Sequence, residues 1–178
     1  MKIFPITSLL ILTLALFSCE QDEDKPALQG CCETPAIDAD FGNAHVYLPN
    51  IFTPNNDGIN DLLSVYGDSI QEIINFEIRN SEDELVYQVE NIHLYDTLNI
   101  WDGTVNGVVE KGLYDISLTL KAFDGTITSF AGKTCNYPCG SVEESEMVDG
   151  TPCQFPIQQD NGHYHPNIAP QEPTDCYK

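Results

Sequence analysis

Hydrophobic and polar residues alternate along several short stretches in the middle of the chain. The longest is residues 114–122, in which every second residue is apolar and the residues between are Asp, Ser, Thr and Lys. Shorter alternations occupy residues 76–79 and 85–89. A period of two places one face of a β-strand on a core and the other in water. We therefore predict strands here, and no stretch of helical length shows a helical period.

Pairs of turn-forming residues separate these stretches. The pairs are Asp57–Gly58, Asp102–Gly103, Asn106–Gly107 and Asp124–Gly125. Such pairs favour the positive φ angles of tight hairpin turns. Short strands with frequent turns predict an all-β fold, and we expect an immunoglobulin-like antiparallel β-sandwich of about seven strands over residues 45–135.

The first 18 residues have a different pattern. One Lys is followed by a mostly apolar run that is too short to span a bilayer comfortably, as in a signal peptide. The next residues, Leu16-Phe17-Ser18-Cys19, resemble a bacterial lipobox. That resemblance implies cleavage before Cys19 and lipid modification of its sulfur, so we predict a lipoprotein. The alternative is an ordinary secretory peptide.

Residues 19–44 are predicted to form a lipidated cysteine and an acidic linker. Residues 20–24 contain four acids, which favours a solvated tether. An acidic stretch after the lipidated cysteine resembles the surface-export signal of Bacteroidetes lipoproteins. This implies a lipid-anchored protein of the outer membrane, exposed at the cell surface. The alternative is a spacer that faces the periplasm.

The charge balance excludes two classes of partner. The chain has 28 Asp and Glu against 7 Lys and Arg, a formal net charge of −21. Phosphates repel such a surface, so we expect no nucleic-acid partner. Binding to a membrane through a polybasic patch is excluded for the same reason.

Six cysteines remain once Cys19 is assigned to lipid. They are Cys31, Cys32, Cys135, Cys139, Cys153 and Cys176. An even number in an exported chain predicts disulfides. The neighbours Cys31 and Cys32 should bond to different partners, and one or both should reach across the domain to the C-terminal group. Residues 136–178 are rich in Cys and Pro and should form an irregular, disulfide-tied tail lying on the sandwich.

Zinc is the alternative role for these thiols, with His163 and His165 as further ligands. The spacing is unfavourable, because Cys135 and Cys139 do not form a C-x₂-C pair and no second matched pair exists. His163 and His165 lie on one side of an extended segment, which suits either a metal or a surface coincidence.

Residues 48–61 read LPNIFTPNNDGIND, and three later segments follow in order: residues 73–80, WDGTVNG at 101–107 and GLY at 112–114. Together they resemble the gliding-motility-associated C-terminal domain, a family that also serves as type B sorting modules of the type IX secretion system. The resemblance implies a β-sandwich and a role in type IX sorting or gliding motility.

Residues 48–61 also contain candidate metal ligands. Asn55, Asp57 and Asp61 have spacings used by calcium-binding loops, and Gly58 permits the sharp turn that such loops need. A structural calcium ion is therefore one interpretation, although Ser64 stands where the loop would need an acid. The alternative is a turn in which Asn and Asp side chains accept hydrogen bonds from backbone N–H groups.

Two further features concern single residues. The only tryptophan, Trp101, is predicted to lie in the core rather than on a ligand platform. Asp68-Ser69-Ile70 and Asp96-Thr97-Leu98 resemble the Bacteroidetes O-glycosylation pattern, which makes Ser69 and Thr97 candidate glycosylation sites.

No catalytic signature accompanies these features, so we predict that the protein is not an enzyme and needs no cofactor besides the calcium ion considered above. Our leading hypothesis is a non-catalytic outer-membrane lipoprotein, docked as an interaction or accessory subunit to a larger envelope complex such as a β-barrel or an export machine. The alternatives are a surface module that binds a glycan or another ligand with the help of calcium, and a type IX secretion or gliding role. The glycan alternative predicts exposed aromatic side chains near Trp101 or Tyr164.

Overall fold

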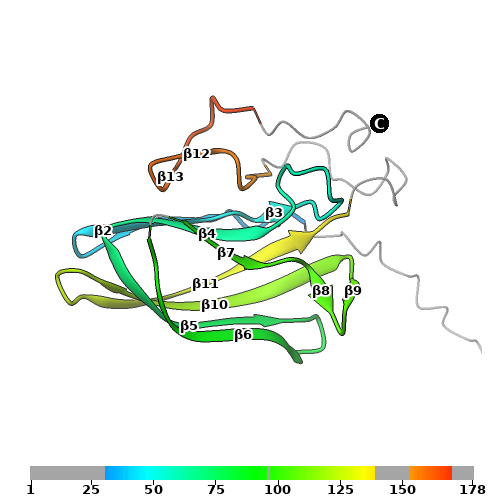
Figure 1. Ribbon diagram of the computed structural model, residues 1–178, viewed down its shortest axis with the longest axis horizontal. Helices are drawn as coiled ribbons and strands as arrows, with labels where there is room; N and C mark the ends of the chain where they lie inside the picture. Colours follow the sequence, from blue (N-terminus) through cyan, green and yellow to red (C-terminus); the bar gives the residue numbers. More distant parts are fainter. Residues whose placement is uncertain (1–30, 96, 139–152, 170–178) are drawn as a thin grey trace, which may run out of the picture.

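The computed structural model describes residues 31–95, 97–138 and 153–169, and within these ranges the chain is all-β without a helix. Two sheets lie face to face (Figure 1), and their neighbouring strands are antiparallel except for β3 and β11, which pair in parallel. The four-stranded sheet has the order β1 (Ile37–Phe41), β2 (Ala44–Leu48), β4 (Leu63–Asp68), β7 (Thr97–Trp101). The five-stranded sheet has the order β3 (Ile51–Phe52), β11 (Ile127–Asn136), β10 (Gly112–Ala122), β5 (Ile70–Arg79), β6 (Leu85–His93). Two small hairpins complete the fold: β8 (Thr104–Val105) with β9 (Val108–Val109), and β12 (Gln159–Asp160) with β13 (His163–Tyr164).

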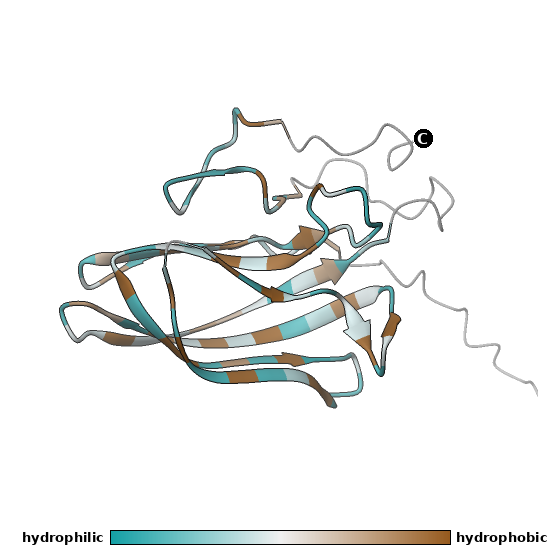
Figure 2. Ribbon diagram, in the orientation of Figure 1, coloured by the Kyte–Doolittle hydropathy of each residue, from teal (hydrophilic) through white to brown (hydrophobic). Residues whose placement is uncertain are grey.

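The core lies between the two sheets. Alternate residues of each strand point into it, which appears as alternating colours along the strands in Figure 2. In β10, Ile116 pairs with Ile78 of β5, and Leu118 pairs with Phe76. These four side chains are at most 4% exposed. The alternation seen in the sequence therefore identifies the core-facing residues of these strands correctly, and the predicted sandwich is confirmed.

The predicted turns also form. Asn106 and Gly107 have φ angles of 53° and 81° and join β8 to β9. Gly125, at φ 89°, lies in the turn between β10 and β11. Both central residues of the Asn106–Gly107 turn have positive φ, as the twist of a two-residue hairpin requires.

The sandwich extends further toward the N-terminus than the predicted start at residue 45. Strand β1 lies within the range predicted as linker and pairs with β2 in antiparallel register. Its sequence, Ile-Asp-Ala-Asp-Phe, is short and two of its five residues are acidic, so its pattern resembles that of the acidic stretch predicted as a tether. Phe41, at the end of β1, packs edge-on against Phe130 of β11 and belongs to the core.

Residues 153–169, called the flap below, lie on the outer face of the four-stranded sheet (Figure 1). The flap contains the β12–β13 hairpin and is otherwise irregular, as predicted for the Cys- and Pro-rich tail. Gly162, at φ 81°, comes so close to β4 that a Cβ added there would lie 2.9 Å from the carbonyl carbon of Gly67. No helix of the described residues is long and apolar enough to cross a membrane.

Two disulfides join the start of the described chain to β11 and to the flap. Cys31 bonds to Cys135 of β11, and Cys32 bonds to Cys153 at the start of the flap. The prediction that the two neighbouring cysteines take different partners in the C-terminal group is confirmed. These bridges belong to a second, smaller apolar cluster that includes Ile51, Tyr137 and Phe155.

Candidate functional site

The segment Thr53–Asp61 forms a compact loop between β3 and β4. Asp61 organises it, because its Oδ1 accepts hydrogen bonds from the backbone N–H groups of Asn55 and Asn56, at 3.0 and 2.7 Å, and its Oδ2 accepts one from Gly58 at 2.7 Å. A carboxylate that caps three backbone donors holds the loop in one conformation. These three hydrogen bonds tie the two ends of the loop together.

The other two predicted calcium ligands are engaged in the same network. Asn55 Oδ1 accepts from the N–H of Asp57 at 3.0 Å, Asp57 Oδ1 accepts from the N–H of Ile59 at 2.8 Å, and Asp57 Oδ2 accepts from Asn55 Nδ2. The structure thus brings Asn55, Asp57 and Asp61 together, and their oxygens serve the turn. This geometry matches the hydrogen-bonded turn considered as the alternative to calcium. Among the residues described, no group of three or more His, Cys, Asp or Glu is placed to hold a metal ion.

Two asparagines within residues 48–61 form hydrogen bonds that hold the flap in place. Asn50, 1% exposed, accepts from the N–H of Gln154 through its Oδ1 at 2.8 Å and donates its own backbone N–H to the Gln154 carbonyl. Asn60, 8% exposed, accepts from the N–H of Ile157 at 2.9 Å. Sequence reasoning noted both residues as part of the motif but assigned them no role. Their partners lie about a hundred positions later in the chain, so no local pattern indicated that these residues contact the flap.

The flap covers two stacked tyrosines. Tyr47 of β2 and Tyr66 of β4 face each other in register on the outer side of the sheet, with ring centroids 5.8 Å apart. The Tyr47 hydroxyl donates to the carbonyl of Phe155 at 2.9 Å, and Tyr164 packs over its ring. Burial raises the pKa of Tyr47 far above its usual value, because a phenolate would be stripped of water. Tyr47 is therefore a neutral hydrogen-bond donor under the flap.

A histidine cluster lies at one edge of the flap. His45 of β2 has an Asp carboxylate at each ring nitrogen, Asp40 at 2.7 Å from Nδ1 and Asp38 at 2.8 Å from Nε2. The ring of His163 stacks on His45 with centroids 3.7 Å apart. The hydrogen bond from His45 lowers the pKa of Asp40, with the electrostatic interaction with His45 as the second cause. Of the two histidines predicted to act together, His163 and His165, only His163 belongs to this cluster.

Trp101 lies in the core, as predicted. It is 3% exposed, its ring packs edge-on against Tyr114, and its Nε1 donates to the Thr104 carbonyl at 3.1 Å. The part of the glycan hypothesis that expected an exposed aromatic surface around Trp101 is therefore wrong. Tyr164 is half-buried in the flap.

The candidate glycosylation residues differ in setting. Ser69 lies at the turn between β4 and β5 with φ 58°, and its hydroxyl donates to Asp68 at 3.2 Å. Thr97 is exposed at the start of β7, an edge strand. Glycosylation at either residue stays a prediction.

The zinc alternative is ruled out for four thiols, because Cys31, Cys32, Cys135 and Cys153 are all consumed in disulfides. The remaining predictions for cysteine fall on Cys19, Cys139 and Cys176. These three residues lie outside the described part of the chain, so lipidation and a third bridge remain predictions.

A cleft of about 920 Å³ opens at the end of the sandwich beside the β5–β6 turn and the β8–β9 hairpin. Leu85 lines it and is 46% exposed, and Val108 of the adjoining hairpin is 67% exposed. Lys111 and Lys133 line the same cleft. It combines apolar and charged walls and lies away from the flap.

Residues 46–130 match the family model of the CHU_C Type IX secretion signal domain. This range includes the loop Thr53–Asp61, called the motif loop below, and most of both sheets, and it ends before the flap. The match agrees with the resemblance seen in the motifs, and it indicates a protein exported to the cell surface or the medium. It covers slightly less than half of the chain, and no curated protein matches the chain.

Among solved structures, the crystal structure of CopC from Methylosinus trichosporium OB3b is similar, with a TM-score of 0.37 and 12% sequence identity. The similarity covers 62% of this chain and 99% of that one. A likeness of this degree says nothing about function.

Proposed function

We propose that this chain is an exported surface protein whose β-sandwich is recognised by a type IX secretion machinery. The observation that carries the proposal is the family match over residues 46–130. The motif loop adds a physical reason, because Asp61 holds it rigid through three backbone hydrogen bonds. A preorganised loop loses little conformational entropy when a partner binds it.

We further propose that Cys19 carries lipid and keeps the exported protein on the outer membrane. The apolar leader, the lipobox-like residues 16–19 and the acids that follow support this anchor. Each buried methylene of an acyl chain contributes about 0.8 kcal/mol, so several long chains hold a protein durably. The sandwich and the anchor would then have separate tasks, recognition during export and retention afterwards.

Localisation in the native host tests both parts. We would compare a parent strain with one lacking the type IX machinery, scoring exposure of the protein to protease added to intact cells. The proposal expects surface protein in the parent and retention inside the envelope in the mutant. Unchanged surface exposure in the mutant would overturn the sorting role. A Cys19→Ala variant should be released into the medium, and continued membrane attachment would overturn the anchor.

An accessory-subunit role is a second candidate, favoured by the cleft with Leu85 and Val108 at its border. Exposed apolar side chains at a cleft mark a surface suited to a protein partner. The test is co-purification from detergent-solubilised membranes with a Leu85→Glu/Val108→Glu variant. Phe123 and Ile127 are comparably exposed in the β10–β11 turn region, so Phe123→Glu/Ile127→Glu is the matched control. A partner lost in the first variant and kept in the second would support the role, and a partner kept in both would exclude this cleft.

A further inference from the structure

The flap makes the outer surface of the four-stranded sheet uneven, because it covers only part of that surface. It lies over β1, β2 and part of β4, and it stops short of β7, the edge strand. Two adjoining hollows of about 410 and 460 Å³ follow its border, and Gln159 of the flap lines both. The paired strands β4 and β7 form a floor, the flap residues 156–162 form a wall, and residues 58–62 of the loop between β3 and β4 line the hollow of about 410 Å³. We call this open groove the trough.

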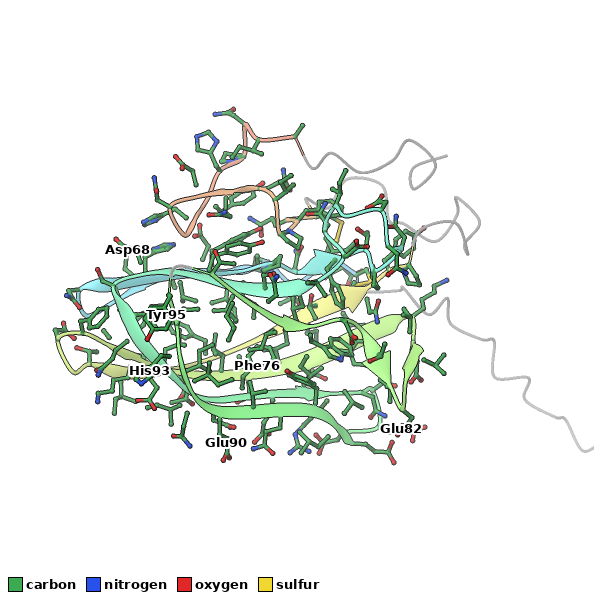
Figure 3. The ribbon with its side chains drawn as sticks, in the orientation of Figure 1. Asp68, Phe76, Glu82, Glu90, His93 and Tyr95 are labelled. Carbon is green, nitrogen blue, oxygen red and sulfur yellow. A yellow bond between two sulfur atoms is a disulfide. The ribbon has the colours of Figure 1, made fainter. Side chains whose placement is uncertain are left out.

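The floor of the trough is polar and regular. Ser64 of β4 pairs in register with Asn99 of β7, and Tyr66 pairs with Thr97. Asp68 follows two residues after Tyr66 on the same face, and Figure 3 shows it on the flap side of the sheet. Four residue steps along β4 correspond to about 13 Å, which is long enough for a short chain rather than a single small molecule.

Two amide groups in the trough are oriented by internal hydrogen bonds. Asn99 Oδ1 accepts from the Ser64 hydroxyl at 2.8 Å, and Gln159 Oε1 accepts from the N–H of Gly162 at 3.1 Å. Because each carbonyl oxygen is engaged, each NH₂ group is left to donate. One donor stands on the floor and the other on the wall. A ligand between them would meet donors whose orientation is already set.

The charges of the trough select the class of ligand. None of the residues lining either hollow is Lys, Arg or His. With a chain charge of −21, such a site repels phosphorylated, sulfated or carboxylated ligands. It has a carboxylate at each end, and that of Asp61 is already committed to three backbone donors. The middle is therefore neutral, and it combines amides and hydroxyls with the Tyr66 ring and the apolar residues Ile59, Leu62, Pro156 and Ile157.

We propose that the trough binds an uncharged oligosaccharide. Sugar hydroxyls both donate and accept, so they match a surface of amide donors, hydroxyls and one available carboxylate, Asp68. The wall is fixed in place by the Cys32–Cys153 bridge and by the hydrogen bonds of Asn50 and Asn60. Most of the residues that line the trough lie within residues 46–130, the range that matches the sorting family, and the flap supplies its wall. Binding of a sugar is a property separate from export, and each is tested by its own experiment.

The test is calorimetric titration of the purified full chain, with its disulfides intact and produced without O-glycosylation, since a glycan on Thr97 would fill the trough. The probes are cellohexaose, xylohexaose, mannohexaose, maltohexaose and chitohexaose. A galacturonic acid hexamer and hexalysine are the charged alternatives. We expect at least one uncharged hexasaccharide to bind. Binding by none of them, or only by a charged probe, would overturn the proposal.

Variants then locate the site. Thr97 and Asn99 are exposed on an edge strand, so a Thr97→Val/Asn99→Leu variant should fold, and its circular dichroism and melting temperature serve as the check. We expect at least a tenfold weaker affinity. Gln88 and Ser117 are exposed polar residues on the outer face of the other sheet, so Gln88→Ala/Ser117→Ala is the matched control and should bind as the parent does. Equal affinity in all three proteins would exclude the trough. Because the assay uses purified protein, its outcome is independent of the localisation test of export.

Discussion

The outer faces of the two sheets carry different side chains, and only one of them is covered by the described chain. On the four-stranded sheet, Tyr47 and Tyr66 point outward and are buried under the flap. On the five-stranded sheet, most outward positions of β6 and β10 are polar and open to water, with Leu85 as an apolar exception; Glu90 in Figure 3 is one of the polar residues. Removing aromatic surface from water lowers the free energy of the folded state, whereas removing polar surface from water does not. The flap therefore covers the face on which burial stabilises the fold.

The uncovered face is stabilised by contacts between neighbouring polar side chains. The Thr119 and Ser129 hydroxyls lie 2.9 Å apart across β10 and β11, and Asn75 donates to Glu77 at 3.1 Å on β5. Such exposed contacts each contribute a few tenths of a kcal/mol at most, because water competes for the same groups. The comparison predicts that equivalent changes cost much more on the covered face than on the uncovered one.

The largest effect should come from the bridge that attaches the flap. A Cys32→Ser/Cys153→Ser variant opens a link between residues 121 positions apart, and we expect the free energy of unfolding to fall by about 3–5 kcal/mol. Urea unfolding measures the loss, and hydrogen exchange of the flap amides measures its release. The control is Cys31→Ser/Cys135→Ser, with a separation of 104, which should cost a similar amount yet leave the flap amides protected. Equal flap exchange in both variants would contradict the assigned role of Cys153.

The next effect concerns one hydroxyl. Tyr47→Phe removes one donor to the Phe155 carbonyl while keeping the ring. The carbonyl still accepts from the N–H of Gln158 at 3.0 Å, so the expected loss is that of one buried hydrogen bond, about 0.5–1.5 kcal/mol. On the uncovered face, Thr119→Val removes a hydroxyl from its contact with Ser129 and should cost less than about 0.5 kcal/mol. Chemical denaturation of both variants checks the difference. Similar losses would mean that the flap does not shield Tyr47 from water.

Two glycines test how closely the flap approaches β4. Gly162 and Gly125 have similar φ angles of 81° and 89°, but a Cβ at Gly162 would press on Gly67, whereas one at Gly125 would meet nothing within 4 Å. Both Ala variants should lose about 1–2 kcal/mol from the unfavourable backbone conformation. Gly162→Ala should lose about 1 kcal/mol more, because the flap must shift. Thermal unfolding of the pair measures this excess, and its absence would place the flap further from the sheet.

The smallest effect is a pH dependence at the edge of the flap. The pKa of Asp40 is lowered by its hydrogen bond from His45, so this contact stabilises the fold above the ordinary carboxyl pKa and is lost as pH falls through the lowered value. We expect the protection factors of the flap amides, which are corrected for the intrinsic pH dependence of exchange, to fall below about pH 4. Asp40→Asn should remove this part of the acid response. On the uncovered face, the pKa of Glu77 is lowered mainly by its hydrogen bond from Asn75, and Glu77→Gln should leave flap exchange unchanged.

Local pattern predicted the strands that alternate clearly. The stretch 114–122 became the core-facing strand β10, and Asn106–Gly107 became a hairpin turn. Strand β1 was missed because its five residues contain two acids and belong to the strand only through pairing with β2. The motif residues Asn55, Asp57 and Asp61 were correctly identified as one local unit, since all their partners lie within six residues.

The sequence by itself determined the all-β class, the hairpin turns and the family resemblance, because these depend on neighbouring residues and on composition. Only the tertiary structure decided which cysteines pair, that Asn50 and Asn60 hold the flap, and that β4, β7 and residues 156–162 enclose a trough. These contacts join positions about a hundred residues apart. Such contacts depend on how the packed sheets bring distant segments together, so they cannot be read from the spacing of residues along the chain.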